Sequence, residues 1–173
     1  RLFILSIFSF AVLSAQLKFD IRKKIANDAK SLFTVDLDRD GDMDFLGVGA
    51  DQESFNWYEN NGSESFTARP LPYTNPPSKV SAVDLDRDGD IDVLAAYKQA
   101  GKIAWLENNG SQSFTERVIS TDYDGISSVF AVDLDRDGDM DLLSFSTGNS
   151  TDKFSWYENN GSQSFTERVI SSN

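Results

Sequence analysis

The residues best suited to chemistry in this sequence are aspartates, which are gathered in three stretches of one pattern. Each stretch of nine residues has Asp at positions 1, 3, 5, 7 and 9 and Gly at position 6; the stretches are 36–44, 84–92 and 133–141. Four carboxylates, the backbone carbonyl of position 7 and water offer about six or seven oxygen ligands, which suits Ca²⁺. The glycine permits the sharp turn that such a loop needs. We therefore predict one structural calcium ion per loop, about three in all, held by Asp36, Asp38, Asp40, Asp42, Asp44, Asp84, Asp86, Asp88, Asp90, Asp92, Asp133, Asp135, Asp137, Asp139 and Asp141.

Other interpretations of these carboxylates fit the pattern less well. Mg²⁺ is less suited to a flexible, carboxylate-rich site. Neither a metal-free acidic turn nor a catalytic carboxylate pair, as in glycosidases, would require the same spacing three times. An EF-hand would need an acidic residue at position 12, where the loops have Gly47, Ala95 and Ser144. Without an ion the aspartates of one loop repel each other, so we expect metal binding and folding to be coupled.

The net charge of −12 arises in the same three stretches. They contain 15 of the 28 acidic residues and 3 of the 16 basic ones, and the rest of the chain has 13 of each sign. The excess charge is therefore local, which indicates cation sites and leaves no basic stripe for nucleic acid. The sequence has neither Cys nor His, which removes disulfides, thiolate metal sites and the usual general base. We expect no enzyme activity.

The elements that position the loops recur with them. The loops begin at residues 36, 84 and 133, and each is followed by a second block: 57–62, 105–110 and 156–161. In the third repeat the apolar patterns predict strands near 129–132, 140–145, 153–158 and 164–170, with a two-residue type I′ turn at Asn160-Gly161. Four strands in about 48 residues are typical of a propeller blade.

The predicted fold is all-β, with tandem four-stranded antiparallel blades of β-propeller type in three repeats over residues 16–173. Because closed propellers have about four to eight blades, we expect a partial propeller or one completed by oligomerisation. The proline-rich stretch 69–77 is expected to be a longer connection between blades. The two terminal faces of the array should expose apolar residues, including those around Trp57 and Trp156, and bind further blades or copies of the chain.

The beginning of the chain differs from the repeats. Residues 1–15 form an apolar run that resembles the hydrophobic region of a secretory signal and is short for a stable membrane span. The alternative is a retained segment that docks into an assembly. Residues 17–21 resemble the strand that precedes the later Asp loops, so we expect them to form the last strand of a blade.

Two further sets of residues recur with the repeats. Trp57, Trp105 and Trp156 occupy one position per repeat, where packing between blades is the expected role and stacking on a sugar ring the alternative. Glycosylation sequons begin at Asn61, Asn109, Asn149 and Asn160. Three of them lie in the hairpin turn, where Asn-Gly-Ser is favoured for its conformation alone, so glycosylation stays open.

The DxDxDGDxD loops, the W-[YL]-E-N-N-G blocks and their period resemble the FG-GAP/VCBS repeat family of integrin-like β-propellers, over roughly residues 17–173. The resemblance implies that the loop aspartates are structural calcium ligands and that the protein is secreted or on the cell surface. It also implies a non-enzymatic, calcium-stabilised binding or adhesion module, with a carbohydrate or a surface protein as ligand. Two alternatives stay open: a structural subunit of an extracellular fibre or surface assembly, and the non-catalytic propeller arm of a larger secreted enzyme.

Overall fold

The computed structural model describes residues 29–50, 54–63, 65–121, 125–147 and 152–172, which form strands and loops without a helix. The expected apolar segment 1–15, the expected strand at 17–21 and the sequon at Asn149 lie outside the described residues. The strands are β1 (Ala29–Val35), β2 (Asp44–Gly49), β3 (Phe55–Asn60), β4 (Phe66–Pro70), β5 (Lys79–Val83), β6 (Asp92–Tyr97), β7 (Lys102–Asn108), β8 (Phe114–Ser120), β9 (Ile126–Val132), β10 (Asp141–Thr147), β11 (Asp152–Asn159) and β12 (Phe165–Ser172).

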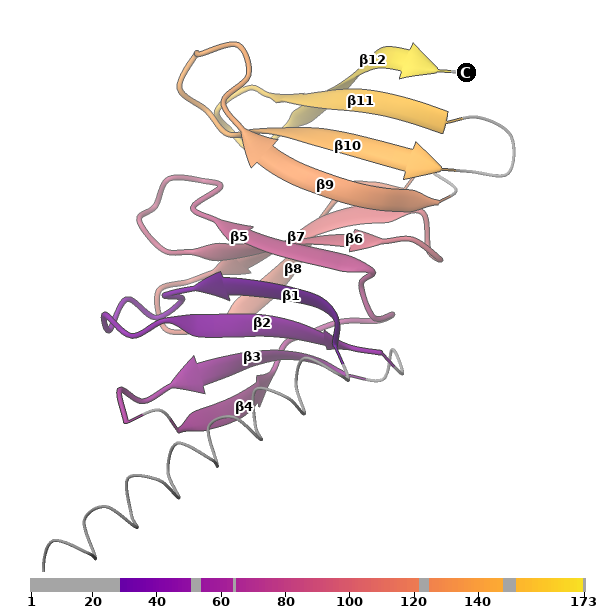
Figure 1. Ribbon diagram of the computed structural model, residues 1–173. Helices are drawn as coiled ribbons and strands as arrows, with labels where there is room; N and C mark the ends of the chain where they lie inside the picture. Colours follow the sequence, from indigo (N-terminus) through magenta and orange to yellow (C-terminus); the bar gives the residue numbers. More distant parts are fainter. Residues whose placement is uncertain (1–28, 51–53, 64, 122–124, 148–151, 173) are drawn as a thin grey trace, which may run out of the picture.

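The strands form three sheets, each made of four consecutive antiparallel strands. Blade 1 contains β1–β4, blade 2 contains β5–β8 and blade 3 contains β9–β12. The blades are stacked face to face in chain order, and they do not close into a ring (Figure 1). The predicted all-β architecture of three propeller-like blades is confirmed.

The four strands of a blade differ in how deeply they are buried. The first strands lie next to one another, because β1 contacts β5 and β5 contacts β9. The second and third strands of the middle blade are buried almost throughout, in keeping with their continuous apolar sequence. The last strands, β4, β8 and β12, contain exposed and partly exposed residues and no buried one. Each blade therefore runs from a first strand close to its neighbours to an exposed outer strand.

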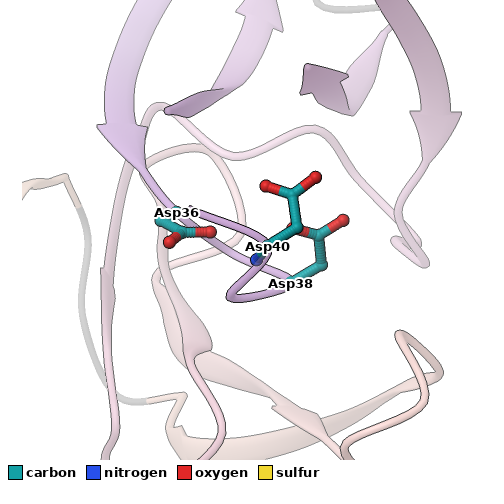
Figure 2. Close-up of side chains that lie close together, drawn as sticks. All are labelled: Asp36, Asp38 and Asp40. Atoms are coloured by element: carbon teal, nitrogen blue, oxygen red, sulfur yellow. The ribbon is translucent and has the colours of Figure 1, made fainter. Parts of the chain in front are cut away.

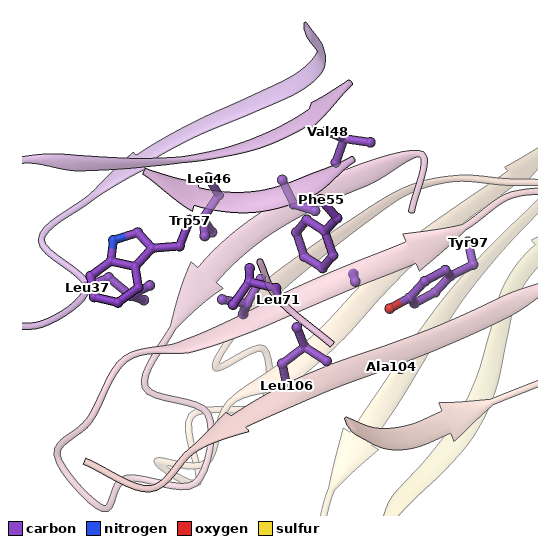
Figure 3. Packing of buried hydrophobic residues seen from close by; sticks show 12 residues of the cluster. Leu37, Leu46, Val48, Phe55, Trp57, Leu71, Tyr97, Ala104 and Leu106 are labelled. Atoms are coloured by element: carbon purple, nitrogen blue, oxygen red, sulfur yellow. The ribbon is translucent and has the colours of Figure 1, made fainter. Parts of the chain in front are cut away.

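Two hydrophobic clusters fill the spaces between blades. The first lies between blades 1 and 2, where Phe55 and Trp57 face Leu106 and Tyr97 (Figure 3). The second lies between blades 2 and 3 and contains Trp105. Trp57 and Trp105 are 1% and 4% exposed, which confirms that they pack between blades. The expectation that Trp57 lies at a terminal face is wrong, because the side of blade 1 that carries it is covered by blade 2.

The connection between β11 and β12 corrects the predicted turn. It has five residues, 160–164, and positive φ occurs at Gly161 (76°) and Gln163 (54°), not at Asn160. The amide of Asn160 donates to the carbonyl of Ser164 at 3.2 Å and its side-chain Oδ1 accepts from the amides of Ser162 and Ser164. A type I′ turn needs positive φ at both central residues, so the asparagine instead caps a longer loop.

The proline-rich connection has the predicted role. It leaves β4 at Pro70 and reaches β5 at Lys79, and so joins blade 1 to blade 2. Leu71 at its start is 4% exposed and belongs to the cluster between these blades. The connection therefore contributes to the core as well as spanning the distance.

Candidate metal centres

Each aspartate-rich stretch forms the loop between the first and second strands of its blade, and ends at the first residue of the second strand. Figure 1 shows the three loops along the same side of the stack. Two residues per loop have positive φ: the arginine at position 4 (61–64° at Arg39, Arg87 and Arg136) and the glycine at position 6 (95–101° at Gly41, Gly89 and Gly138). The arginines adopt a conformation that L-residues rarely take. The loop is therefore tightly wound in the same way three times.

The winding brings three carboxylates of each loop together. In loop 1 the group consists of Asp36, Asp38 and Asp40, which Figure 2 shows gathered about the turn. Within each group one carboxylate oxygen per residue lies within 4.8 Å of the others. The groups of the other two loops are Asp84, Asp86 and Asp92, and Asp133, Asp135 and Asp137. The remaining predicted ligands are Asp42, Asp44, Asp88, Asp90, Asp139 and Asp141, whose side chains are not part of these groups.

Backbone amides orient the middle carboxylates of the loop. Asp38 Oδ1 accepts from the amide of Asp40 at 3.3 Å, and Asp40 Oδ1 accepts from the amide of Asp42 at 2.8 Å. The same pair of bonds recurs in loops 2 and 3. Each bond engages one oxygen of the carboxylate, so the other oxygen is available for a cation. The bonds also hold the side chains of positions 3 and 5 in fixed orientations.

The first aspartate of each loop has a buried oxygen with no hydrogen-bond partner. This is Oδ1 of Asp36, of Asp84 and of Asp133. A buried polar atom without a partner costs about 1–3 kcal/mol, and more when it is charged. A cation within the group would satisfy this oxygen, and the carboxylate donors suit a hard divalent ion. The three loops therefore have the geometry and the chemistry to hold a metal ion each.

The aspartate at position 9 connects the loop to the sheet. Asp92 is fully buried, and its oxygens accept from the backbone amides of Leu85 (3.0 Å) and Asn108 (2.8 Å). Asp44 and Asp141 make the corresponding bonds in their blades. In blade 1 the indole Nε1 of Trp57 also donates to Asp44 Oδ2 at 2.9 Å. Position 9 thus joins the start of the loop to the end of the third strand.

Sequence reasoning missed the partner of this aspartate on the third strand. It is the first asparagine of each W-[YL]-E-N-N-G block: Asn60, Asn108 and Asn159. Its side-chain amide also donates to the backbone carbonyl of position 8, at 3.1–3.2 Å. The constant presence of this asparagine three residues after each tryptophan was the available signal. The block and the Asp loop are therefore two halves of one hydrogen-bonded unit.

Burial affects the ionisation of the loop carboxylates. Desolvation raises the pKa of Asp92 to about 7, although the amides of Asn108 and Leu85 favour the charged form. Desolvation also raises the pKa of Asp38, Asp44 and Asp86. Neighbouring carboxylates add to the increase at each of these residues. A bound cation would counter both effects, because it favours the ionised carboxylate.

A family model for FG-GAP-like repeats matches residues 36–95 and 84–144. The two matches together run from residue 36 to residue 144 and contain all three Asp loops, well over half of the 173 residues. A comparison with curated proteins gave no match. In the part of the chain that the structure covers, no helix is long and apolar enough to span a membrane. FG-GAP repeats are binding or structural modules, typically extracellular and generally without enzyme activity. With these matches over its loops and blades, the chain belongs to the FG-GAP-like repeat family.

Proposed function

We propose that the chain is a calcium-stabilised, non-enzymatic binding module of a secreted or cell-surface protein. The observation that carries this proposal is the buried, unpartnered carboxylate oxygen at the first position of all three loops. The typical extracellular placement of FG-GAP repeats supports it, since millimolar calcium outside cells occupies even weak sites. The ligand class that we expect is a carbohydrate or a surface protein.

The ion would be held by carboxylates at positions 1, 3 and 5 in loops 1 and 3, and at positions 1, 3 and 9 in loop 2. Its positive charge would offset the repulsion among the aspartates and fix the loop between the first two strands. Loop 3 is also tied to the preceding blade, because Arg87 Nη1 lies 3.3 Å from Asp139 Oδ1. We expect calcium to stabilise the packing of blades as well as the individual loops.

A binding role without catalysis is consistent with how the side chains are used. The sequence has no His or Cys, and the clustered carboxylates serve the loops. Trp57 and Trp105 are buried between blades, which leaves them no room to stack on a sugar ring. A carbohydrate or protein ligand would therefore bind away from these two side chains, whereas Trp156 is partly exposed.

Isothermal titration calorimetry on the full chain tests the proposal. The wild type should take up about three Ca²⁺ ions, and chelation should lower its thermal midpoint. Asp84→Asn removes charge from the carboxylate with the buried oxygen and should abolish one of the sites. Asp90→Asn is the matched control in the same loop, because the side chain of Asp90 lies outside the carboxylate group. An absence of calcium uptake, with the same thermal midpoint in chelator, would overturn the proposal.

A structural subunit of an extracellular assembly is the second candidate. The specific observation in its favour is that large apolar side chains are exposed on the two end faces of the blade array, such as Leu32 on blade 1 and Phe154 on blade 3. Such faces favour association with another chain.

A further inference from the structure

The two ends of the array expose faces that are buried elsewhere in the chain. We call the side of a blade that faces the next blade its forward face, and the side that faces the preceding blade its rear face. Phe55 and Ile103, at one equivalent position of the forward faces of blades 1 and 2, are 1% and 0% exposed. Phe154 occupies this position in blade 3 and is 50% exposed. The forward face of blade 3 thus has the composition of an internal interface but no neighbour among the described residues.

The rear face of blade 1, at the other end of the array, is exposed in the same way. Val80 and Val129, at one position of the rear faces of blades 2 and 3, are 7% and 4% exposed. Their counterpart in blade 1, Leu32, is 49% exposed. On the same face the rings of Phe45 and Tyr58 stack with centroids 4.6 Å apart. This face also carries apolar side chains and is uncovered by the described residues.

The exposed apolar residues are concentrated on these two faces. Of the nine large hydrophobic side chains that are exposed among the described residues, seven occupy positions of the two end faces. These are Leu32 and Met43 on blade 1, and Phe130, Val132, Leu134, Phe154 and Ile170 on blade 3. The other two, Val118 and Val169, are equivalent residues of the outer strands β8 and β12. Val118 is exposed even though blade 2 has neighbours on both sides, so outer-strand exposure does not depend on a missing blade.

Charged residues repeat the same relation between neighbouring blades. The position-4 arginine of a blade reaches over the glycine of the next loop: Arg87 Nη2 lies 3.1 Å from where a Cβ on Gly138 would be. The same arginine forms the ion pair with Asp139. Arg39 Nη1 lies 3.6 Å from the corresponding Cβ position of Gly89, but among the described residues the ion pair itself is formed by Arg87 and Asp139 and not by Arg39 and Asp90.

At each end of the array, one side of this contact between the arginine and the next loop lacks its counterpart among the described residues. Arg136 of blade 3 has no ion-pair partner within the described chain. At the other end, no atom of the described residues lies within 4 Å of a Cβ position on Gly41. Next to Gly41 lies Asp42, which corresponds to Asp139 in blade 3. One end thus supplies the arginine, and the other supplies the glycine and the aspartate.

We propose that the forward face of blade 3 binds the rear face of blade 1 of a second copy of this chain, in the register of the two internal interfaces. In this register Arg136 extends over the partner copy's loop and pairs with the aspartate at position 7. A second copy fits both faces, because this chain carries both halves of the contact, apolar and charged. Two copies would supply six blades, within the range of about four to eight that propellers close. A head-to-tail contact of this kind closes into a ring or extends into a filament.

Sedimentation velocity on the full chain in calcium, over a range of micromolar concentrations, tests the interface. The sedimentation coefficient of the wild type should increase with protein concentration, because a larger fraction of the chains associates. Phe154→Glu and Leu32→Glu each place a charge in one half of the contact, and each variant alone should remain monomeric. Val169→Glu is the matched control, since Val169 is 53% exposed but lies outside the contact, and it should associate like the wild type. Circular dichroism melts would show that all three variants remain folded.

A mixture of the two blocked variants gives the sharpest outcome. The Phe154→Glu chain keeps an intact blade 1, and the Leu32→Glu chain keeps an intact blade 3. An equimolar mixture should therefore form dimers through a single interface, although neither variant associates alone. Arg136→Asp should weaken wild-type association a few-fold, and adding Asp42→Arg to the same chain should restore it.

Three results would overturn the proposal. One is a wild-type chain that stays monomeric at all concentrations, which would assign the faces to other blades or another protein. Another is a Leu32→Glu variant that associates like the wild type, because that would indicate contact between two copies of blade 3. The third is association that survives every substitution, which would indicate an origin outside these faces.

Discussion

At the scale of single residues, the aspartates of one loop do different work. Positions 1 and 3 gather their oxygens with those of position 5 in loops 1 and 3 and of position 9 in loop 2, while the side chain of position 7 lies outside the group in each loop. Position 9 is the most buried and accepts amide hydrogen bonds from two separate segments. The aspartates of a loop therefore serve cation binding and anchorage of the loop to its sheet, and Asp139 also forms an ion pair with the neighbouring blade.

The anchoring role predicts a specific loss of stability. In Asp92→Asn the side-chain NH₂ group would face a backbone amide donor, Leu85 or Asn108, and leave a buried donor unsatisfied. We expect the free energy of unfolding to fall by about 1–3 kcal/mol. Urea denaturation in chelator at pH 8, above the pKa of Asp92, measures this loss without the effect of calcium. The control, Asp88→Asn, changes an exposed loop aspartate and should alter stability by no more than about 0.5 kcal/mol. Equal effects of the two substitutions would contradict the anchoring role.

The candidate site was only partly predictable from the sequence. The spacing of the aspartates and the glycine indicated a cation loop, since oxygen donors and a sharp turn follow from residue type alone. Which oxygen of Asp92 faces which amide depends on the packing of the third strand against the loop, and the sequence does not specify that packing. The role of Asn108 was missed for the same reason. Its side chain contacts the carbonyl of Ile91, a residue far from it in the sequence.

At the scale of elements, the strands were more predictable than the connections between them. The apolar periodicity of the third repeat located β9–β12, although the structure extends β9 back to Ile126 and β11 to Asn159. The turn after β11 was wrong because Asn-Gly is compatible with several loops. The hydrogen bonds of Asn160 to two serines favour the five-residue form. Local residue preferences set the number of strands, and side-chain bonds set how they are joined.

The repeated tryptophans provide an internal comparison of the interfaces between blades. Trp105 is 4% exposed between blades 2 and 3, whereas Trp156, at the equivalent position of the forward face of blade 3, is partly exposed, and its buried Nε1 is without a hydrogen-bond partner. Trp105→Ala should destabilise the chain by about 3–5 kcal/mol, because it leaves a cavity in a packed core. Trp156→Ala should cost clearly less.

Urea denaturation followed by circular dichroism measures both tryptophan substitutions. The protein should be dilute enough to be monomeric, so that association does not contribute to the difference. If Trp156→Ala destabilised the dilute chain as much as Trp105→Ala, the forward face of blade 3 would have to be covered within one molecule.

At the scale of the whole molecule, the blades of the described chain form a linear array in which each packs against its neighbours in the sequence. Blade 1 packs on blade 2, and blade 2 packs on blade 3, through the two separate hydrophobic clusters. In such arrays stability is approximately the sum of repeat and interface contributions. Blade 2 takes part in both interfaces, while each end blade takes part in one. The order of stability along the chain should follow this difference.

Hydrogen exchange should therefore be slowest in the middle of the molecule. The amides of β6 and β7 lie in a blade covered on both faces, and we expect them to exchange only on global opening. The equivalent strands of blade 3, β10 and β11, should exchange faster, because that blade can separate from the rest by breaking one interface. Exchange followed by mass spectrometry on the dilute chain measures these rates by peptide. At concentrations where copies associate, the head-to-tail contact would cover the forward face of blade 3 and slow the exchange of β11 toward that of β7. An exchange rate in β11 equal to that of β7 in the dilute monomer would contradict the linear arrangement, because it would require blade 3 to be held by more than its single contact with blade 2.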